Sequence, residues 1–250
     1  MPATPAWPPK SLPRLFVRQP LSKGELLKLD AAQANYLGNV MRLGPGAELL
    51  VFDGQSGEWL ARIAKAGKRR MSLAIQHQTR DREPASEVWL AFAPVKRSQT
   101  DWLVEKATEL GADRLLPVMT QRTVTERVKL ARLEAIAIEA AEQCGRTRLP
   151  AIEEPVALTR LLENRDPDRR LYFADEGGGE PAANAFRRGP ALILTGPEGG
   201  FTNEERSIIR AAPNSAPVSL GPRILRAETA ALAALASYMA IAGDWRLIDS

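Results

Sequence analysis

The stretch LILTGPEGGFTNEE, residues 192–205, decides which fold we expect. Its first three residues are apolar, as in a buried strand. The run then breaks into Gly-Pro-Glu-Gly-Gly before a polar segment typical of a helix start. Thr202 and Glu205 have the spacing of a capping box. The turn lacks the Gly-Lys-Ser ending of a phosphate-binding loop and places Glu198 among the glycines. It therefore reads as a strand-to-helix turn that holds no phosphate.

The sequence around this turn alternates between strand and helix patterns. Short apolar runs of strand type occupy residues 88–95, 170–175, 191–196 and 216–221. Helical periodicity marks residues 100–111, 129–145, 203–212 and 227–243. This alternation predicts an α/β domain with a largely parallel sheet.

The first third of the chain has a different pattern, with short apolar runs cut by Gly, Asp and Pro. The segment GAELLVFDGQSGEWLARIAKAG, residues 46–67, predicts two strands joined by a turn. We expect a small β-rich domain there. The predicted division is a flexible arm at 1–13, a β-domain at 14–78, a linker at 79–87 and the α/β domain at 88–250.

Composition excludes several classes of protein. The 250 residues include one cysteine, Cys144, and one histidine, His77. These rule out an internal disulfide and a cysteine-based or histidine-rich metal site, and leave little room for Ser-His catalysis. We expect Cys144 to pack a helix and His77 to be structural. No apolar run is long enough to span a membrane and no signal peptide is visible, so we expect a cytoplasmic protein without metal or membrane partners.

Charge is distributed unevenly along the chain. Residues 1–85 carry 13 Lys and Arg against 7 Asp and Glu, whereas residues 86–250 carry 21 against 23. A basic first domain is typical of a module that meets a polyanion such as RNA. Ordinary scatter of surface charge is the alternative interpretation.

A second glycine turn follows the strand pattern at 216–221. It begins the segment SLGPRILRAETAALAAL, residues 219–235. Ligands of parallel sheets bind at the C-terminal ends of strands, and glycine lets backbone groups approach a ligand closely. Two Gly-Pro turns can thus line one pocket with backbone groups that read an adenine and a ribose. Two plain tight turns remain the alternative.

Together these two segments resemble the RsmE family of 16S ribosomal RNA uridine methyltransferases, which belong to the SPOUT class. Four more segments carry the resemblance: KRSQTDWLVEKATELGADRLLPVMTQRTV at 96–124, EAAEQCGRTRLPAI at 139–152, RLFV at 14–17 and NVMRLGPGAELLVFDG at 39–54. The resemblance implies a trefoil-knotted α/β methyltransferase domain behind a PUA-like β-barrel. It also implies a homodimer that uses S-adenosylmethionine to methylate N3 of uridine 1498 of 16S rRNA in the small ribosomal subunit.

The same resemblance implies which residues bind the cofactor, largely through backbone groups. They are Leu194, Thr195, Gly196, Gly199, Leu220, Gly221, Ile224, Leu225, Arg226 and Ala227. A different modification, such as ribose 2′-O methylation, and a non-catalytic role in ribosome assembly are the alternative functions.

Uracil N3 carries a proton, so methylation requires a base or a cation that stabilises the uracil anion. We expect Arg226 to be the cation, with a phosphate clamp or a helix-end ion pair as the alternative. Glu198 and Glu228 are the candidate bases. Their alternatives are a cap of the glycine turn and a favourable first-turn helix charge. The expected RNA contacts are Arg14, Arg18, Arg42, Lys68, Arg69, Arg70, Arg122, Gln143 and Arg146.

Overall fold

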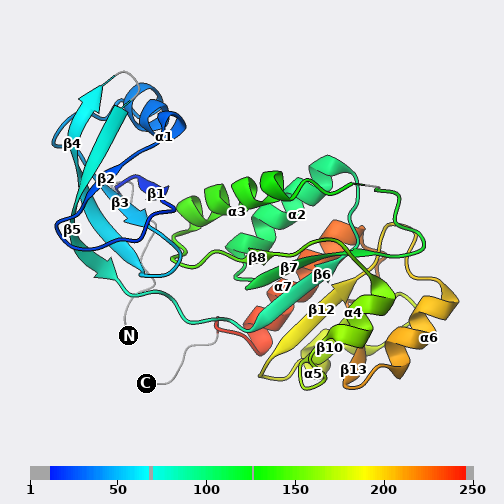
Figure 1. Ribbon diagram of the computed structural model, residues 1–250. Coiled ribbons are helices and arrows are strands. Elements are labelled where there is room, and N and C mark those ends of the chain that lie inside the picture. Colours follow the sequence, from blue (N-terminus) through cyan, green and yellow to red (C-terminus); the bar gives the residue numbers. More distant parts are fainter. Residues whose placement is uncertain (1–11, 68–69, 126, 246–250) are drawn as a thin grey trace. The chain divides into compact units, whose positions relative to one another are not determined.

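The computed structural model describes residues 12–67, 70–125 and 127–245 (Figure 1). By their contacts, these residues divide into two compact units. Unit 1 comprises residues 1–84 together with 142–148, and unit 2 comprises 85–141 together with 149–250. Each unit has its own hydrophobic core.

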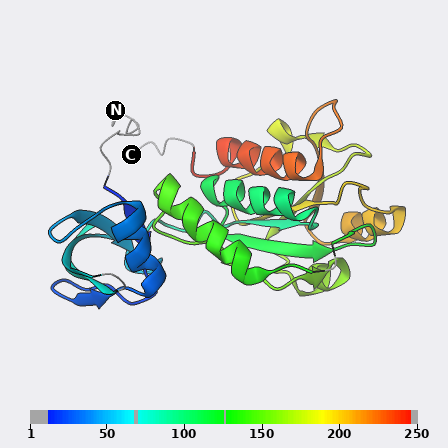
Figure 2. The same cartoon turned by 90° about the horizontal axis from the view of Figure 1, so that it is seen from above.

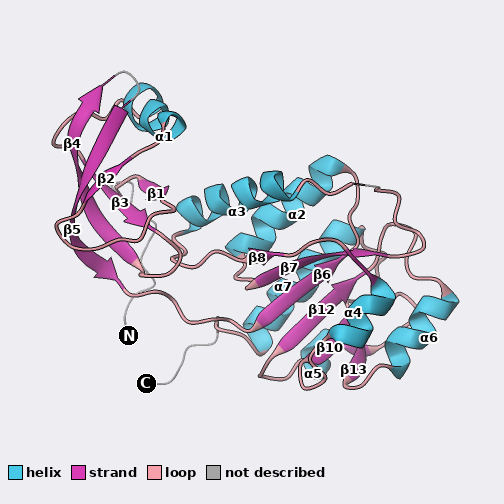
Figure 3. Ribbon diagram, in the orientation of Figure 1, coloured by secondary structure: helices cyan, strands magenta, loops and turns pink. Residues whose placement is uncertain are grey.

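Unit 1 is built on a five-stranded sheet in the order β1-β3-β4-β5-β2 (Figure 3). Its strands are β1 (Arg14–Phe16), β2 (Leu26–Lys28), β3 (Glu48–Phe52), β4 (Glu58–Gly67) and β5 (Arg70–Arg80). β1 runs parallel to β3, and the other pairings are antiparallel. A helix α1 (Ala31–Asn35) and a π-helix η1 (Tyr36–Val40) follow β2. The β-rich first domain expected from the sequence is confirmed.

The strand-turn-strand pattern at 46–67 forms β3 and β4. The carboxylate of Asp53 accepts hydrogen bonds from the backbone N–H groups of Gln55 and Ser56, at 2.8 and 2.7 Å, and so fixes the turn between them. Alternate residues of β3, such as Leu49 and Val51, are fully buried in the core of unit 1. The period of two in the sequence thus matches one buried face of the sheet.

Unit 2 contains one parallel sheet in the order β11-β13-β10-β12-β6-β7-β8, with β9 also pairing with β7. The strands are β6 (Val88–Phe92), β7 (Arg114–Met119), β8 (Ala151–Ile152), β9 (Val156–Ala157), β10 (Arg170–Ala174), β11 (Glu180–Pro181), β12 (Ala191–Thr195) and β13 (Ser215–Ser219). Every strand pairing in unit 2 is parallel, which confirms the predicted class of sheet. The trefoil knot stays a prediction.

Helices cover both faces of this sheet (Figure 2). They are α2 (Arg97–Glu109), α3 (Leu130–Cys144), α4 (Leu158–Asn164), α5 (Ala182–Ala185), α6 (Asn203–Ala211) and α7 (Ala227–Ile241). α2, α3, α5 and α7 pack into one core with β6 and β12, and α4 and α6 pack into a second core on the other face. The predicted capping box forms at the start of α6, where Thr202 and Glu205 exchange hydrogen bonds.

The structure differs from the predicted division of the chain at residues 142–148, which belong to unit 1 and not to the α/β unit. The reason is a set of hydrogen bonds. Arg14 donates to the carbonyl oxygens of Glu142 and Arg146 at 3.1 and 2.7 Å, and the backbone N–H of Phe16 donates to the Glu142 carboxylate at 2.8 Å. Arg80 donates to the carbonyl of Gly145 at 2.8 Å. Sequence patterns do not reveal such long-range contacts.

Candidate functional site

A cavity of about 220 Å³ lies at the C-terminal edge of the parallel sheet in unit 2. Its walls come from the loops at 174–178, 195–201 and 218–225, which follow β10, β12 and β13, and from the first turn of α7. These three strands are neighbours in the order β13-β10-β12, so their loops meet at one place (Figure 1). The C-terminal edge is where parallel sheets bind ligands.

The first wall is the glycine turn after β12. Gly196 lies against the ring of Phe201, so an added Cβ there would come within 3.2 Å of the ring. The backbone N–H of Gly200 donates to the carbonyl of Pro197 at 2.9 Å, and Gly200 has φ +66°. The turn is therefore closed by its own backbone, and a side chain at Gly196 would require the Phe201 ring to shift.

The turn after β13 forms the second wall. Gly221 has φ +106°, a conformation that glycine adopts without strain. Ile224 is 94% exposed, whereas Leu225 is partly buried. Of the predicted cofactor residues, the following line the cavity: Thr195, Gly196, Leu220, Gly221, Ile224, Leu225 and Ala227. Leu194, Gly199 and Arg226 are not among the lining residues.

The third wall, formed by the loop after β10, was not predicted from the sequence. It contains Asp175 and Glu176, both of which line the cavity. The Asp175 side chain is fully buried and forms an ion pair with Arg210 at 2.6 Å, while Glu176 forms one with Arg206 at 2.7 Å. Both arginines come from α6, so the ion pairs tie the end of β10 to that helix. A signal was present, because the strand pattern at 170–175 is followed by Glu-Gly-Gly-Gly.

The three candidate catalytic side chains have different environments. Arg226 is exposed and is the N-cap residue of α7, without a side-chain capping hydrogen bond. Glu198 is exposed and lines the cavity, whereas Glu228 is 8% exposed in the first turn of α7. Within the described part of the chain, no ion pair or hydrogen bond joins any two of these three. The alternative role of Glu198, capping of the glycine turn, is also not observed among the described residues.

Arg122 supports the glycine turn from a neighbouring loop. Its guanidinium donates to the carbonyl of Gly199 at 2.6 Å, and its side chain packs beneath the Gly199 Cα. The buried carboxylate of Glu205 accepts a hydrogen bond from the backbone N–H of Gln121 at 2.7 Å while it caps α6. The loop after β7 and the turn after β12 are thus held together at the edge of the cavity.

The predicted RNA contacts in unit 1 differ in their exposure to solvent. Arg18, Arg42, Arg70 and Gln143 are exposed. Lys68 and Arg69 lie outside the described residues.

Arg14 and Arg146 are different, because their side chains are only 9% exposed. Arg14 pairs with Glu58 at 2.7 Å and lies 4.5 Å from the centre of the Phe52 ring, and Arg146 pairs with Glu83 at 2.9 Å. Burial raises the pKa of Glu58, but hydrogen bonds from Arg80 and Arg14 outweigh it and hold that pKa below its ordinary value. Arg14 and Arg146 therefore hold unit 1 together and do not present a free charge to RNA.

Neither a metal-binding cluster nor a membrane-spanning helix occurs in residues 12–67, 70–125 and 127–245. That part of the chain contains no group of three or more His, Cys, Asp or Glu side chains able to hold a metal ion. Its helices are also too short or too polar for any one of them to cross a bilayer.

Comparison with known families defines the class of protein. Residues 81–239 match the family model of an RNA methyltransferase domain, and residues 29–76 match that of an RNA methyltransferase PUA domain. The class is therefore that of RNA methyltransferases with an appended PUA domain.

Curated relatives and solved structures narrow this class. The chain is 31% identical to ribosomal RNA small subunit methyltransferase E of Rickettsia conorii, over 89% of this chain and 93% of the relative. It superposes on a ribosomal RNA small subunit methyltransferase E from Neisseria gonorrhoeae bound to S-adenosyl methionine, with TM-score 0.85, 30% identity and coverage of 94% and 99%. A putative methyltransferase from Legionella pneumophila, in complex with the cofactor SAM, gives TM-score 0.88, 28% identity and coverage of 94% and 100%. The chain belongs to the RsmE family of RNA methyltransferases.

Proposed function

We propose that this protein transfers a methyl group from S-adenosylmethionine to N3 of uridine 1498 of 16S rRNA in the small ribosomal subunit. The observation that carries the proposal is the cavity formed by three neighbouring strand ends, two of them glycine turns of the RsmE type. Family membership and the SAM-bound relatives support the choice of cofactor.

The cavity has the chemistry that S-adenosylmethionine requires. The side chains of Phe201, Leu220 and Leu225 provide apolar surface for an adenine ring. The backbone of the turns at Gly196 and Gly221 is open to hydrogen bonding with the base and the ribose. The carboxylate of Glu176 in the third wall suits the hydroxyl groups or the ammonium group, while the buried carboxylate of Asp175 is held by Arg210. When bound, the cofactor supplies an activated methyl group on a sulfonium.

The protein's remaining task is to prepare the acceptor. Glu198 lines the cavity as an exposed carboxylate, and we assign it as the base that takes the N3 proton of the uracil. Arg226 is the N-cap residue of α7, so its positive charge lies beside the positive end of the helix dipole. We assign Arg226 to stabilise the negative charge that moves onto the uracil oxygens. Glu228 is buried in the first turn of α7 and is assigned to support that helix end.

Substrate recognition is assigned to both units. Unit 1 carries the exposed cations Arg18, Arg42 and Arg70, which suit the phosphates of an RNA. The target base has to leave its stack before it reaches the methyl donor, as in other enzymes that modify bases. We also propose a homodimer, supported by the exposed apolar side chains of Trp102 and Ile224 in unit 2. Sedimentation at micromolar concentration tests this state.

The direct test uses small ribosomal subunits from a strain that lacks the gene. The purified protein and S-adenosylmethionine should restore one N3-methyluridine, located at position 1498 by mass mapping of RNA fragments. A methyl group on a ribose 2′ oxygen would instead establish the alternative modification. If calorimetry detects no binding of S-adenosylmethionine up to millimolar concentration and no methyl group is transferred, the protein is a non-catalytic RNA-binding factor.

A further inference from the structure

Unit 2 contains a second recess, of about 110 Å³, that the proposed reaction does not use. It lies between the segment that follows β6, at 94–101, and the start of α3 with described residues of the loop before it, at 125 and 127–133. Its charged lining comprises Arg97, Arg127, Lys129 and Arg132, with Asp101 as the one carboxylate among the lining residues.

The backbone at the base of this recess is fixed by hydrogen bonds. Thr100 is buried, and its hydroxyl both donates to the carbonyl of Val95 and accepts from the Val95 N–H, each at 3.1 Å. The hydroxyl of Thr125 donates to the same carbonyl at 2.7 Å. The two sides of the recess are therefore joined through Val95, so the cations on each side are held near one another without a ligand.

The charge of the recess is positive and largely uncompensated. Arg132 forms a two-pronged ion pair with Asp101, at 2.7 to 3.0 Å, which neutralises the one lining carboxylate. Arg97, Arg127 and Lys129 are exposed and form no ion pair with any residue that the structure describes. Between positions 122 and 132 the sequence has four cations and one anion, Glu126. The net charge of this segment is therefore positive. Like charges gathered around one recess repel one another, and a bound anion relieves that repulsion.

The recess lies beside the proposed cofactor cavity. β6 and β12 are neighbours, with Phe92 paired to Thr195. The next residue, Ala93, donates its N–H to the carbonyl of Thr195 at 3.1 Å, and Thr195 lines the cofactor cavity. The chain then continues from Ala93 into Pro94 and Val95, which line the recess. Because β6 and β12 are parallel neighbours, the segments that follow them begin at the same edge of the sheet, and both sites lie there.

We infer that the recess formed by Arg97, Arg127 and Lys129 binds a backbone phosphate of the RNA close to the target nucleotide. This inference rests on the proposed function and assigns part of the RNA-binding surface to the methyltransferase unit itself. Guanidinium groups pair with phosphate oxygens in a two-pronged geometry, so two arginines and a lysine suit a phosphodiester. A phosphate held here positions the flipped base with respect to the methyl donor.

The test is the double variant R127Q/K129Q, matched with R160Q/R188Q. Arg160 and Arg188 are exposed, lie in unit 2 and form no ion pair with a described residue. Binding of an RNA containing the target is measured over a range of salt concentrations. The plot of log affinity against log salt has a negative slope, and each lost phosphate contact makes it shallower by about 0.7 for a single strand. We expect the magnitude of the slope for R127Q/K129Q to decrease by about 1 to 1.5. The KM for RNA should rise at least tenfold, and the affinity for the cofactor should stay unchanged.

Several results would overturn the inference. If R127Q/K129Q has the slope and KM of R160Q/R188Q while the wild type methylates RNA, the recess is not an RNA site and the proposed function stands. If calorimetry shows inorganic phosphate binding that the double variant loses, without a change in the RNA slope, the recess serves a free anion. If the wild type neither binds nor methylates RNA, the proposed function fails and the inference fails with it.

Discussion

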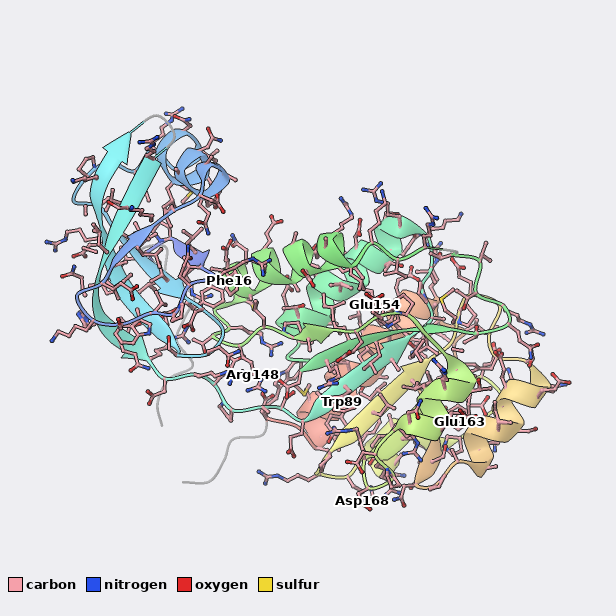
Figure 4. The ribbon with its side chains drawn as sticks, viewed as in Figure 1. Phe16, Trp89, Arg148, Glu154, Glu163 and Asp168 are labelled. Atoms are coloured by element: carbon pink, nitrogen blue, oxygen red, sulfur yellow. The ribbon has the colours of Figure 1, made fainter. Side chains whose placement is uncertain are left out.

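At the N-terminal edge of the parallel sheet two arginines are packed against the fold, whereas four cations at the C-terminal edge face solvent. Arg169, which precedes β10, lies 3.8 Å from the centre of the Trp89 ring (labelled in Figure 4). It also donates to the carbonyl oxygens of Glu87 and Ala191. Arg114 approaches the same ring at 4.3 Å and pairs with a carboxylate at 2.7 Å. Burial lowers the pKa of Arg169.

Four cations at the other edge have no such partners among the described residues, unlike Arg132, Arg206 and Arg210, which pair with carboxylates there. Arg97, Arg127, Lys129 and Arg226 are exposed and form no ion pair in the described part of the chain. Both edges belong to one sheet and draw on the same residue types, so composition does not explain the difference. The N-terminal edge uses arginine to satisfy carbonyl groups and to cover an aromatic ring. The C-terminal edge leaves these four cations available to a ligand.

The largest predicted effect is that of Arg226→Ala on turnover. Loss of a group that stabilises charge in the transition state typically costs about 100- to 1000-fold in rate. The thermal midpoint should not change, because the side chain is exposed and makes no capping hydrogen bond. Single-turnover methylation at saturating cofactor measures the rate, with R188A as the control. An equally large loss of cofactor affinity would make Arg226 a cofactor-binding residue instead.

Next in size is Arg169→Ala, which tests the structural role of the N-terminal edge. The backbone carbonyl groups of Glu87 and Ala191 lose a donor and Trp89 loses the nearer of its two arginines, so the free energy of unfolding should fall by about 2 kcal/mol. The same change at the other edge, R127A, should alter it by less than about 0.5 kcal/mol. Denaturant unfolding followed by fluorescence gives both values. Equal losses for the two variants would remove the distinction between the edges.

A smaller effect is expected for Gly221→Ala, with Gly189→Ala as its counterpart at the other edge. Both glycines have positive φ, at +106° and +129°, and neither leaves an added Cβ within 4 Å of another residue. Strain alone should therefore cost each variant about 1–2 kcal/mol of stability. Only G221A should also weaken cofactor binding, by roughly tenfold, because only Gly221 lines the cavity. Calorimetry with S-adenosylmethionine would refute this if G189A weakened binding as much.

Local patterns in the sequence predicted much of unit 2 and part of its site. The capping box of Thr202 and Glu205, and the glycine at 111 that follows α2, mark helix ends through contacts within a few residues. The turns at 195–200 and 219–222 were expected at strand ends, and both line the cavity. These features depend on neighbouring residues, so they can be recognised in the sequence without a structure.

Features that depend on distant contacts could not be predicted in this way. Arg14 and Arg18 lie four positions apart in one basic segment, yet Arg14 is buried by a carboxylate 44 residues away while Arg18 stays exposed. Asp175 and Glu176 were not predicted because their arginine partners lie 35 and 30 residues further along, respectively, in α6. The basic recess beside α2 likewise combines segments about 30 residues apart. Spacing along the chain does not reveal which cations find a partner.

The smallest effect concerns Tyr238 of α7, whose hydroxyl donates to the carbonyl of Gly189 at 2.5 Å. Burial raises the pKa of Tyr238 to about 12. An unfolded tyrosine ionises near pH 10, so the folded protein holds this proton more tightly than the unfolded chain. Its contribution to stability is therefore complete below pH 10 and is lost as the pH rises from about 10 towards 12. Wild-type protein should lose stability across that window.

Tyr238→Phe removes the ionising group from the N-terminal edge. At neutral pH the variant should lose about 1 kcal/mol with the hydrogen bond to Gly189. Between pH 10 and 12 its stability should decline less steeply than that of the wild type, as measured by thermal midpoints at each pH. Arg226→Ala, at the opposite edge, should keep the wild-type decline. Parallel curves of thermal midpoint against pH for wild type and Y238F would show that Tyr238 is not protected from ionisation. They would also weaken the conclusion that the N-terminal edge contributes to stability.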